Sequence, residues 1–176
     1  MEKRSYRELG VALVGLPASG KTSSGVLLAD LLGMPFVDLD ERVEREAGRS
    51  IPALFEDEGE DGFRRRERVA LERVAAGVAA GEPVVLATGG GTVELPENRS
   101  VLRERFVTVW IKVDPAAAAA RSLGSGRPLL SGDVEAGLRR LYERRRAWYD
   151  ECAAIAVQSD GMRPAMLAEA IREALR

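Results

Sequence analysis

The chain has 176 residues, of which 45% are hydrophobic, a size and composition that predict one domain with a sizeable core. Its 26 basic and 28 acidic residues give a net charge of -2, so no basic excess would draw it to nucleic acid or to an anionic membrane. The absence of histidine and the single cysteine, Cys152, exclude histidine-dependent triads, the usual zinc sites and an internal disulfide. Any chemistry therefore rests on Lys, Arg, Asp, Glu and backbone amides.

The apolar stretches of the chain are short. None approaches the roughly 18 residues that a membrane-spanning helix needs, and no apolar signal-peptide core follows the charged start MEKRSYRELG. A lone thiol also suits a reducing compartment. We therefore expect a soluble, cytoplasmic protein that binds neither membrane nor nucleic acid, and we expect it to be a monomer.

Short β-branched apolar runs alternate with segments of helical pattern along the chain. Strands are predicted at 11–14, 36–38, 83–87, 106–113 and 155–158. Helices are predicted at 21–32, at 40–48, from Ser50, at 59–80, from Pro115, at 133–149 and at 164–175. This alternation predicts an α/β fold, a three-layer domain in which helices flank a mostly parallel five-stranded sheet. No linker divides the chain, so we expect a single domain over 1–176.

Residues 15–22, Gly-Leu-Pro-Ala-Ser-Gly-Lys-Thr, match the phosphate-binding pattern G-x-x-x-x-G-K-[ST] between a predicted strand and a predicted helix. The glycines let backbone N–H groups point at phosphate oxygens, the helix N-terminus adds partial positive charge, and Lys21 adds a mobile cation. Thr22 is the expected magnesium ligand. The loop predicts a nucleoside triphosphate site whose contacts come from Gly15, Ala18, Ser19, Gly20, Lys21, Thr22 and Ser23.

Two observations limit the class of enzyme and point to two carboxylates. The only asparagine, Asn98, lies in Glu-Asn-Arg, so the guanine-reading N-K-x-D is absent, which counts against a GTPase. The predicted strand 83–87 lacks the acidic residue at its end that usually helps to bind magnesium in P-loop proteins. Asp38 and Asp40 follow a short strand, where one can face the metal and the other an acceptor hydroxyl. Alternatively, Asp40 simply caps the helix that begins after it.

Three other segments carry glycines or arginines. Three consecutive glycines, at 89–91, follow a buried strand. Ordering glycines on folding costs conformational entropy, which indicates that another group approaches this backbone closely, and we interpret the segment as a substrate-facing loop. The arginine runs at 64–66 and 144–146 are typical of solvated helix faces, with an anion contact as the alternative for the second. The Gly- and Ser-rich stretch 123–132 has the composition of a mobile flap, and it carries one cation, Arg127.

Taken in order, these motifs resemble the shikimate kinases, P-loop kinases similar to the nucleoside monophosphate kinases, over nearly the whole chain. The family pattern runs from the P-loop through D-x-D, F-R-x-x-E, G-G-G and R-P-L-L to R-x-x-x-Y. It is matched here by 15–22, by Asp38 and Asp40, by 63–67, by 89–91, by 127–130 and by 145–149. The resemblance also implies a small substrate-binding region at 36–66 and a lid at 122–133.

The resemblance implies a role for each of these residues. ATP and Mg²⁺ are the implied cofactors, with Thr22 and Asp38 at the metal. Lys21, Asp40 and Arg127 are the implied catalytic residues, and Arg121 and Arg127 join the P-loop in binding ATP. Shikimate is the implied substrate, bound by Asp40, Arg64, Gly89, Gly90, Gly91 and Arg145.

Two departures from the family pattern affect placement. The loop from Arg121 to Arg127 is one residue shorter than expected, and Ala147 replaces the proline of R-x-P-x-Y. The second leaves a choice between Arg145 and Arg146 for the carboxylate clamp, and we prefer Arg145, four residues before Tyr149.

The implied reaction is transfer of the γ-phosphoryl group of ATP to the 3-hydroxyl of shikimate, in chorismate and aromatic amino acid biosynthesis. Asp40 would orient the hydroxyl. A kinase of another small hydroxy acid such as gluconate, a nucleoside monophosphate kinase and a non-catalytic nucleotide-binding module are the alternatives. Paired arginines around a glycine loop favour a compact carboxylate as the acceptor.

Overall fold

The structure is a computed structural model that describes residues 5–123 and 133–176. Arg127 and most of the predicted lid at 122–133 lie outside these residues. The described strands form one sheet in the order β2-β3-β1-β4-β5, and every neighbouring pair is parallel. They are β1 (Val11–Val14), β2 (Phe36–Asp38), β3 (Val85–Ala87), β4 (Val107–Lys112) and β5 (Ile155–Gln158). The predicted strands and the predicted α/β sheet are confirmed.

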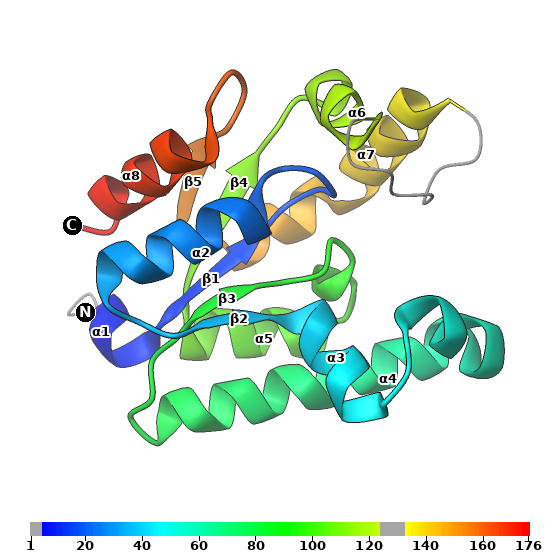
Figure 1. Ribbon diagram of the computed structural model, residues 1–176, viewed down its shortest axis with the longest axis horizontal. Helices are drawn as coiled ribbons and strands as arrows, with labels where there is room; N and C mark the ends of the chain where they lie inside the picture. The colour runs from blue at the N-terminus through cyan, green and yellow to red at the C-terminus, as the bar shows by residue number, and fades with distance from the viewer. Residues whose placement is uncertain (1–4, 124–132) are drawn as a thin grey trace.

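The helices and a 3₁₀ turn connect these strands (Figure 1). In chain order they are α1 (Tyr6–Leu9), α2 (Lys21–Leu32), α3 (Leu39–Ala47), α4 (Ile51–Ala79), η1 (Thr92–Glu94), α5 (Pro96–Arg105), α6 (Pro115–Leu123), α7 (Val134–Cys152) and α8 (Pro164–Ala174). Among them, no helix in the described ranges combines the length and the apolar character needed to cross a bilayer.

The sheet is buried on both faces, as parallel sheets usually are. Alternate residues of β1 illustrate this, because Val11 and Leu13 pack with α2 and α8 whereas Ala12 and Val14 pack with α4, α5 and α7. All four side chains of β1 are fully inaccessible. The result is the predicted three-layer sandwich, in which the loops after β1, β2 and β3 share one edge of the sheet, where parallel α/β folds bind ligands (Figure 1).

The segment 51–79 differs from its prediction in detail. The sequence predicted a helical start at Ser50 followed by a separate helix over 59–80, and the structure joins both into α4 with a break at Gly59. Gly59 has φ 68° and ψ -176°, a left-handed conformation that glycine adopts without steric cost. The break turns the first part of α4 away from the longer second part, which carries the arginine run 64–66.

Helix α5 was missed because it does not bury an apolar stripe. Two of its three buried residues are polar, Asn98 and Arg99, and they bond the preceding turn. Asn98 donates to the carbonyl oxygen of Thr92 at 2.9 Å, and Arg99 donates to that of Val93 at 2.8 Å. A hydrophobic period cannot reveal such a helix, although Pro96 at its first position is a start signal. The short α1 and η1 were also not predicted.

Candidate active site

The phosphate loop joins β1 to α2 in a strained conformation. Gly15 has φ 149°, and a Cβ atom there would lie 2.5 Å from the carbonyl oxygen of Ile111, so only glycine fits against β4. Ala18 has φ 58°, a left-handed conformation that costs a non-glycine residue about 1–2 kcal/mol. Strain of this kind is retained where a loop must present its N–H groups in one arrangement, as in a phosphate cradle.

Two cations hold this loop from opposite sides. Lys21 is 8% exposed, and its Nζ donates to the carbonyl oxygens of Gly15 and Leu16 at 2.9 and 2.8 Å. Arg121, on α6, donates to the carbonyl oxygens of Ala18 and Ser19 at 3.4 Å each. Its other bonds go to Oγ and the carbonyl oxygen of Ser159 at 3.2 and 2.6 Å. The predicted ATP residues outside the lid are thus brought together.

The serines of the loop lie at different depths. Ser19 is fully buried, and its Oγ has no hydrogen-bond partner within the described residues. Ser23 is exposed, with its Oγ 3.4 Å from the carbonyl oxygen of Gly20. The backbone amides at the start of α2 can therefore face a phosphate without competition from these side chains.

Thr22 and Asp38 lie together at the same edge of the sheet. The Thr22 hydroxyl donates to Oδ2 of Asp38 at 2.8 Å, while Oδ1 of Asp38 accepts from the amides of Asp40 and Glu41 at 3.0 and 3.3 Å. Asp38 therefore caps α3, and the interpretation of Asp40 as the cap is wrong. One hydroxyl and one carboxylate oxygen are hard ligands of the kind that Mg²⁺ takes when phosphates and waters complete its shell, so these residues fit that ion.

Asp40 lies in the first turn of α3 and faces the glycine loop. A Cβ atom on Gly89 would lie 2.8 Å from Oδ1 of Asp40 and 2.9 Å from Oε1 of Glu67, so the two carboxylates converge on this glycine. Burial raises the pKa of Asp40 to about 6, and the negative charges of Glu67 and Asp38 add to this rise. A carboxyl group with such a pKa is ionised near neutral pH and is more basic than an exposed aspartate.

Arg64 is the inward-facing member of its arginine run. Its NH1 donates to Oε2 of the fully buried Glu67 at 2.8 Å, and its side chain is 15% exposed. Arg65 and Arg66 are exposed, as a solvated helix face predicts. A Cβ atom on Gly91 would lie 2.2 Å from NH2 of Arg64, so the guanidinium rests directly on the glycine loop.

Arg145 is the inward-facing member of the second run. It is 7% exposed, whereas the side chains of Arg144 and Arg146 are 59% and 60% exposed. A Cβ atom on Gly90 would lie 3.4 Å from NH1 of Arg145. The helical phase of α7 thus favours Arg145 over Arg146 for a contact in this pocket.

Tyr149 fastens α7 to the glycine loop. Its hydroxyl donates to the carbonyl oxygen of Gly90 at 2.7 Å, and burial raises the pKa of Tyr149 above its usual value, so it stays a protonated donor. Glycines 89–91 therefore lie against Asp40 at Gly89 and against two guanidiniums at Gly90 and Gly91. This arrangement can hold a small anion and present a hydroxyl to the phosphate loop.

Two functional candidates beside the arginines were not singled out from the sequence. Glu67 ends the F-R-x-x-E motif, and it joins Arg64 to Thr92, whose hydroxyl donates to Oε1 of Glu67 at 2.6 Å. Glu94 bonds Arg145 through Oε1. The spacing of Arg64 and Glu67 on one helix face was the available signal for the first, and the sequence carries none for the second.

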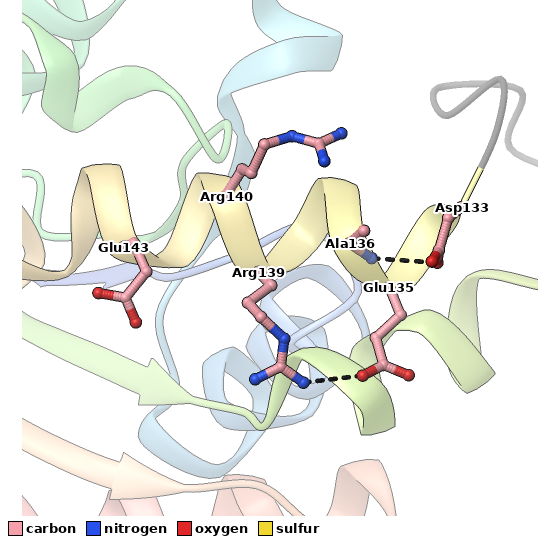
Figure 2. Close-up of a pocket in the computed structure, with 6 residues that line it drawn as sticks. All are labelled: Asp133, Glu135, Ala136, Arg139, Arg140 and Glu143. Carbon is pink, nitrogen blue, oxygen red and sulfur yellow. Dashed lines mark hydrogen bonds and ion pairs between the residues drawn. The ribbon is translucent and has the colours of Figure 1, made fainter.

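Two grooves lie away from this cluster. The larger, of about 630 Å³, runs along α7 beside Asp133, Glu135, Ala136, Arg139, Arg140 and Glu143 (Figure 2). All of these residues except Ala136 are charged, and Arg139 pairs with Glu135 at 2.8 Å. The smaller, of about 360 Å³, lies between α3 and α4. Neither includes a predicted site residue, so the chemistry is assigned to the cluster around the glycine loop.

Known proteins resemble this chain over most of its length. The family model described as shikimate kinase matches residues 17–176. A shikimate kinase of Symbiobacterium thermophilum is 46% identical over 86% of this chain and 87% of that protein. The structure of shikimate kinase from Acinetobacter baumannii in complex with shikimate superposes with a TM-score of 0.86 at 34% identity, covering 96% and 93% of the two chains.

A more distant structure shares the fold alone. A gluconokinase from Sinorhizobium meliloti superposes with a TM-score of 0.64 at 18% identity, covering 98% of this chain and 93% of that one. The same architecture therefore occurs in kinases that act on different small acids, so the acceptor must be inferred from the residues around the glycine loop and not from the fold.

Proposed function

This chain belongs to the shikimate kinase family, and from that premise we propose how its own residues carry out the transfer of the γ-phosphoryl group of ATP to the 3-hydroxyl of shikimate. The observation that carries the assignment of residues is the convergence of Asp40, Arg64 and Arg145 on glycines 89–91, at the sheet edge that also bears the phosphate loop.

The nucleotide site is built by the phosphate loop and by Arg121. Backbone N–H groups of the phosphate loop and of the start of α2, together with Lys21, contact the phosphates, as the loop conformation and the buried ammonium group support. Arg121 uses its N–H groups in the plane of the guanidinium to bond Ser159 and the loop, which leaves its flat face available for stacking on adenine. Arg127, outside the described residues, is proposed to reach the transferring phosphoryl group from the lid.

Thr22 and Asp38 are proposed to hold Mg²⁺ through their oxygens. When bound, this ion neutralises negative charge on the β- and γ-phosphates. The 2.8 Å contact between the two side chains supports the assignment, because ligands of one ion have to lie close together.

The acceptor is proposed to lie against the glycine loop, where Asp40 of α3, Arg64 of α4 and Arg145 of α7 converge. Arg64 and Arg145 face its carboxylate, and a clamp of two guanidiniums gives both affinity and orientation. Asp40 accepts a hydrogen bond from the attacking hydroxyl and takes its proton during transfer. Because the transition state of phosphoryl transfer is loose, most of the rate enhancement comes from positioning and from charge stabilisation.

The pH dependence of activity follows from the pKa of Asp40. The proton-accepting form is the carboxylate, so kcat/KM for shikimate should be constant well above pH 6 and should fall as the pH drops through about 6. Glu67→Gln removes a neighbouring negative charge, and the apparent pKa should then move down. Glu72→Gln, which alters an exposed pair on the same helix, is the matched control. A rate that stays flat down to pH 4.5 would exclude Asp40 as the base.

An ADP-release assay with ATP and magnesium tests the acceptor. Shikimate, quinate, gluconate and a nucleoside monophosphate are compared. We expect saturable turnover with shikimate at a kcat/KM at least about a hundredfold above gluconate and the nucleotide, because a site built to bond particular ring hydroxyls rejects molecules that do not present them. Quinate, which keeps these hydroxyls and adds one, is the most demanding competitor. Preference for gluconate would keep the phosphate chemistry and overturn the pocket assignment. Tight nucleotide binding without turnover would support a binding module instead.

The cellular setting follows from this reaction. We propose that the enzyme serves chorismate and aromatic amino acid biosynthesis, in the cytoplasm and as a monomer.

A further inference from the structure

Glu94 is the last residue of η1 and lies outside every motif discussed above. Its side chain is 12% exposed. Oε1 of Glu94 accepts a hydrogen bond from Nε of Arg145 at 2.8 Å and forms an ion pair with NH2 of Arg145 at 2.7 Å, while Oε2 accepts from NH2 of Arg144 at 2.9 Å. A nearly buried carboxylate thus holds a nearly buried guanidinium that is assigned to the substrate.

The geometry of this pair leaves part of Arg145 for another anion. A guanidinium offers five N–H groups on a rigid fork, and Glu94 occupies the edge formed by Nε and NH2. The remaining terminal nitrogen, NH1, is the one that faces Gly90. A carboxylate in the pocket can therefore bind NH1 of Arg145 while Glu94 stays bound to Nε and NH2.

Glu94 is itself fixed in place. Its amide donates to the carbonyl oxygen of Gly91 at 3.0 Å, and its own carbonyl oxygen accepts from NH1 of Arg99 at 3.2 Å. The carboxylate also acts on the second arginine of the clamp. Burial opposes the charge of Arg64, but the charges of Glu67, Glu94 and Glu60 outweigh this and raise its pKa.

We propose that Glu94 is a positioning residue that sets the orientation of Arg145, so that NH1 meets the carboxylate of the acceptor. The inference rests on the proposed function, in which Arg145 binds that carboxylate. Fixing a long side chain before the substrate arrives removes an entropy cost from binding. Glu94 would then act on substrate affinity and leave the chemical step unchanged.

The opposite role would require Glu94 to compete with the substrate for Arg145. Its two oxygens already engage two arginines and its backbone is held at both ends, which favours the positioning role. The two roles predict opposite changes in KM, which makes a single substitution decisive.

The test is Glu94→Gln, which keeps the shape of the side chain and removes its charge. Charge-assisted bonds are about twice as strong as neutral ones, so KM for shikimate should rise about tenfold, with kcat and KM for ATP changed less than about twofold. The matched control is Glu143→Gln, which removes the charge of an exposed pair with Arg146 on α7 and should change nothing. Glu94→Asp keeps the negative charge on a side chain that is one methylene shorter, and it should raise KM for shikimate by a smaller factor.

A double substitution separates positioning from general structural damage. Because Glu94 acts through Arg145, adding Glu94→Gln to Arg145→Leu should raise KM no further than Arg145→Leu alone. An unchanged or lower KM in Glu94→Gln overturns the inference, as does additivity in the double variant. If Glu94→Gln does not fold, Glu94→Asp takes its place in both comparisons. Turnover of shikimate by the parent enzyme is measured alongside, and its absence would instead overturn the proposed function.

Discussion

Replacing Asp40 with asparagine is expected to lower kcat by about two to four orders of magnitude, the usual contribution of a positioned general base. The amide can still accept a hydrogen bond from the hydroxyl, but it cannot take the proton. ATP affinity should change little, because the proposed nucleotide contacts come from the phosphate loop and Arg121 and not from Asp40. The measurement is kcat with saturating shikimate, together with nucleotide binding by calorimetry.

Stability distinguishes this effect from misfolding. The pKa of Asp40 is higher in the folded enzyme than its ordinary value, so the folded state holds this proton more tightly, and the contribution of Asp40 to stability is greatest below about pH 4. As the pH rises toward 6, this stability is lost, by roughly 2–3 kcal/mol in total. Asp40→Asn carries no such charge, and near neutral pH it should unfold at the same Tm as the parent or a higher one.

The control for Asp40→Asn is Asp30→Asn, at an exposed position on α2. Its kcat and Tm should match those of the parent enzyme. Wild-type turnover in Asp40→Asn would remove Asp40 from the mechanism. A large fall in Tm with equal loss of nucleotide binding would make Asp40 a structural residue.

Lys21→Met is expected to lower kcat by about three orders of magnitude, since it removes the cation proposed to stabilise charge on the transferring phosphoryl group. It also removes the ammonium that donates to the carbonyl oxygens of Gly15 and Leu16, so the loop should bind ATP less tightly as well. Steady-state kinetics with varied ATP measure both effects. Transfer within tenfold of the parent rate would contradict the role of Lys21.

Lys112→Met is the matched control for Lys21→Met. Lys112 lies at the end of β4 with its Nζ 4.3 Å from the centre of the Trp110 ring, a cation–π contact that involves none of the proposed site residues. Its loss should cost some stability and leave kcat unchanged. Comparison of the two variants separates the loss of a lysine in general from the loss of the cation at the phosphates.

The phosphate loop could be predicted because local residues determine it. Gly15, Lys21 and Thr22 lie within eight consecutive positions, and the strand before and the helix after them are plain from the pattern. The sheet could be predicted for the same reason, since each strand is a short apolar run between turn residues. Local signals of this kind can be recognised in a single sequence.

The acceptor site needed the ordered set of motifs, because its members come from distant parts of the chain. Composition alone could not tell Arg64 from Arg65, or Arg145 from Arg144, since helical phase against the rest of the fold decides which side chain turns inward. Glu94 was missed because its partner lies 51 positions away. No periodicity encodes such a contact.

The hydrogen bond from Tyr149 to Gly90 affects when the enzyme can become active during its synthesis. The two residues are 59 positions apart, and their contact closes one of the longer loops of the fold. The chain emerges from the ribosome from its N-terminus, so Gly90 is made well before Tyr149, and Ser159, which accepts from the Arg121 that supports the phosphate loop, is made later still. Neither the acceptor pocket nor the phosphate loop is therefore fully supported until α7 and β5 have both been made, so the two parts of the site become complete together, late in synthesis.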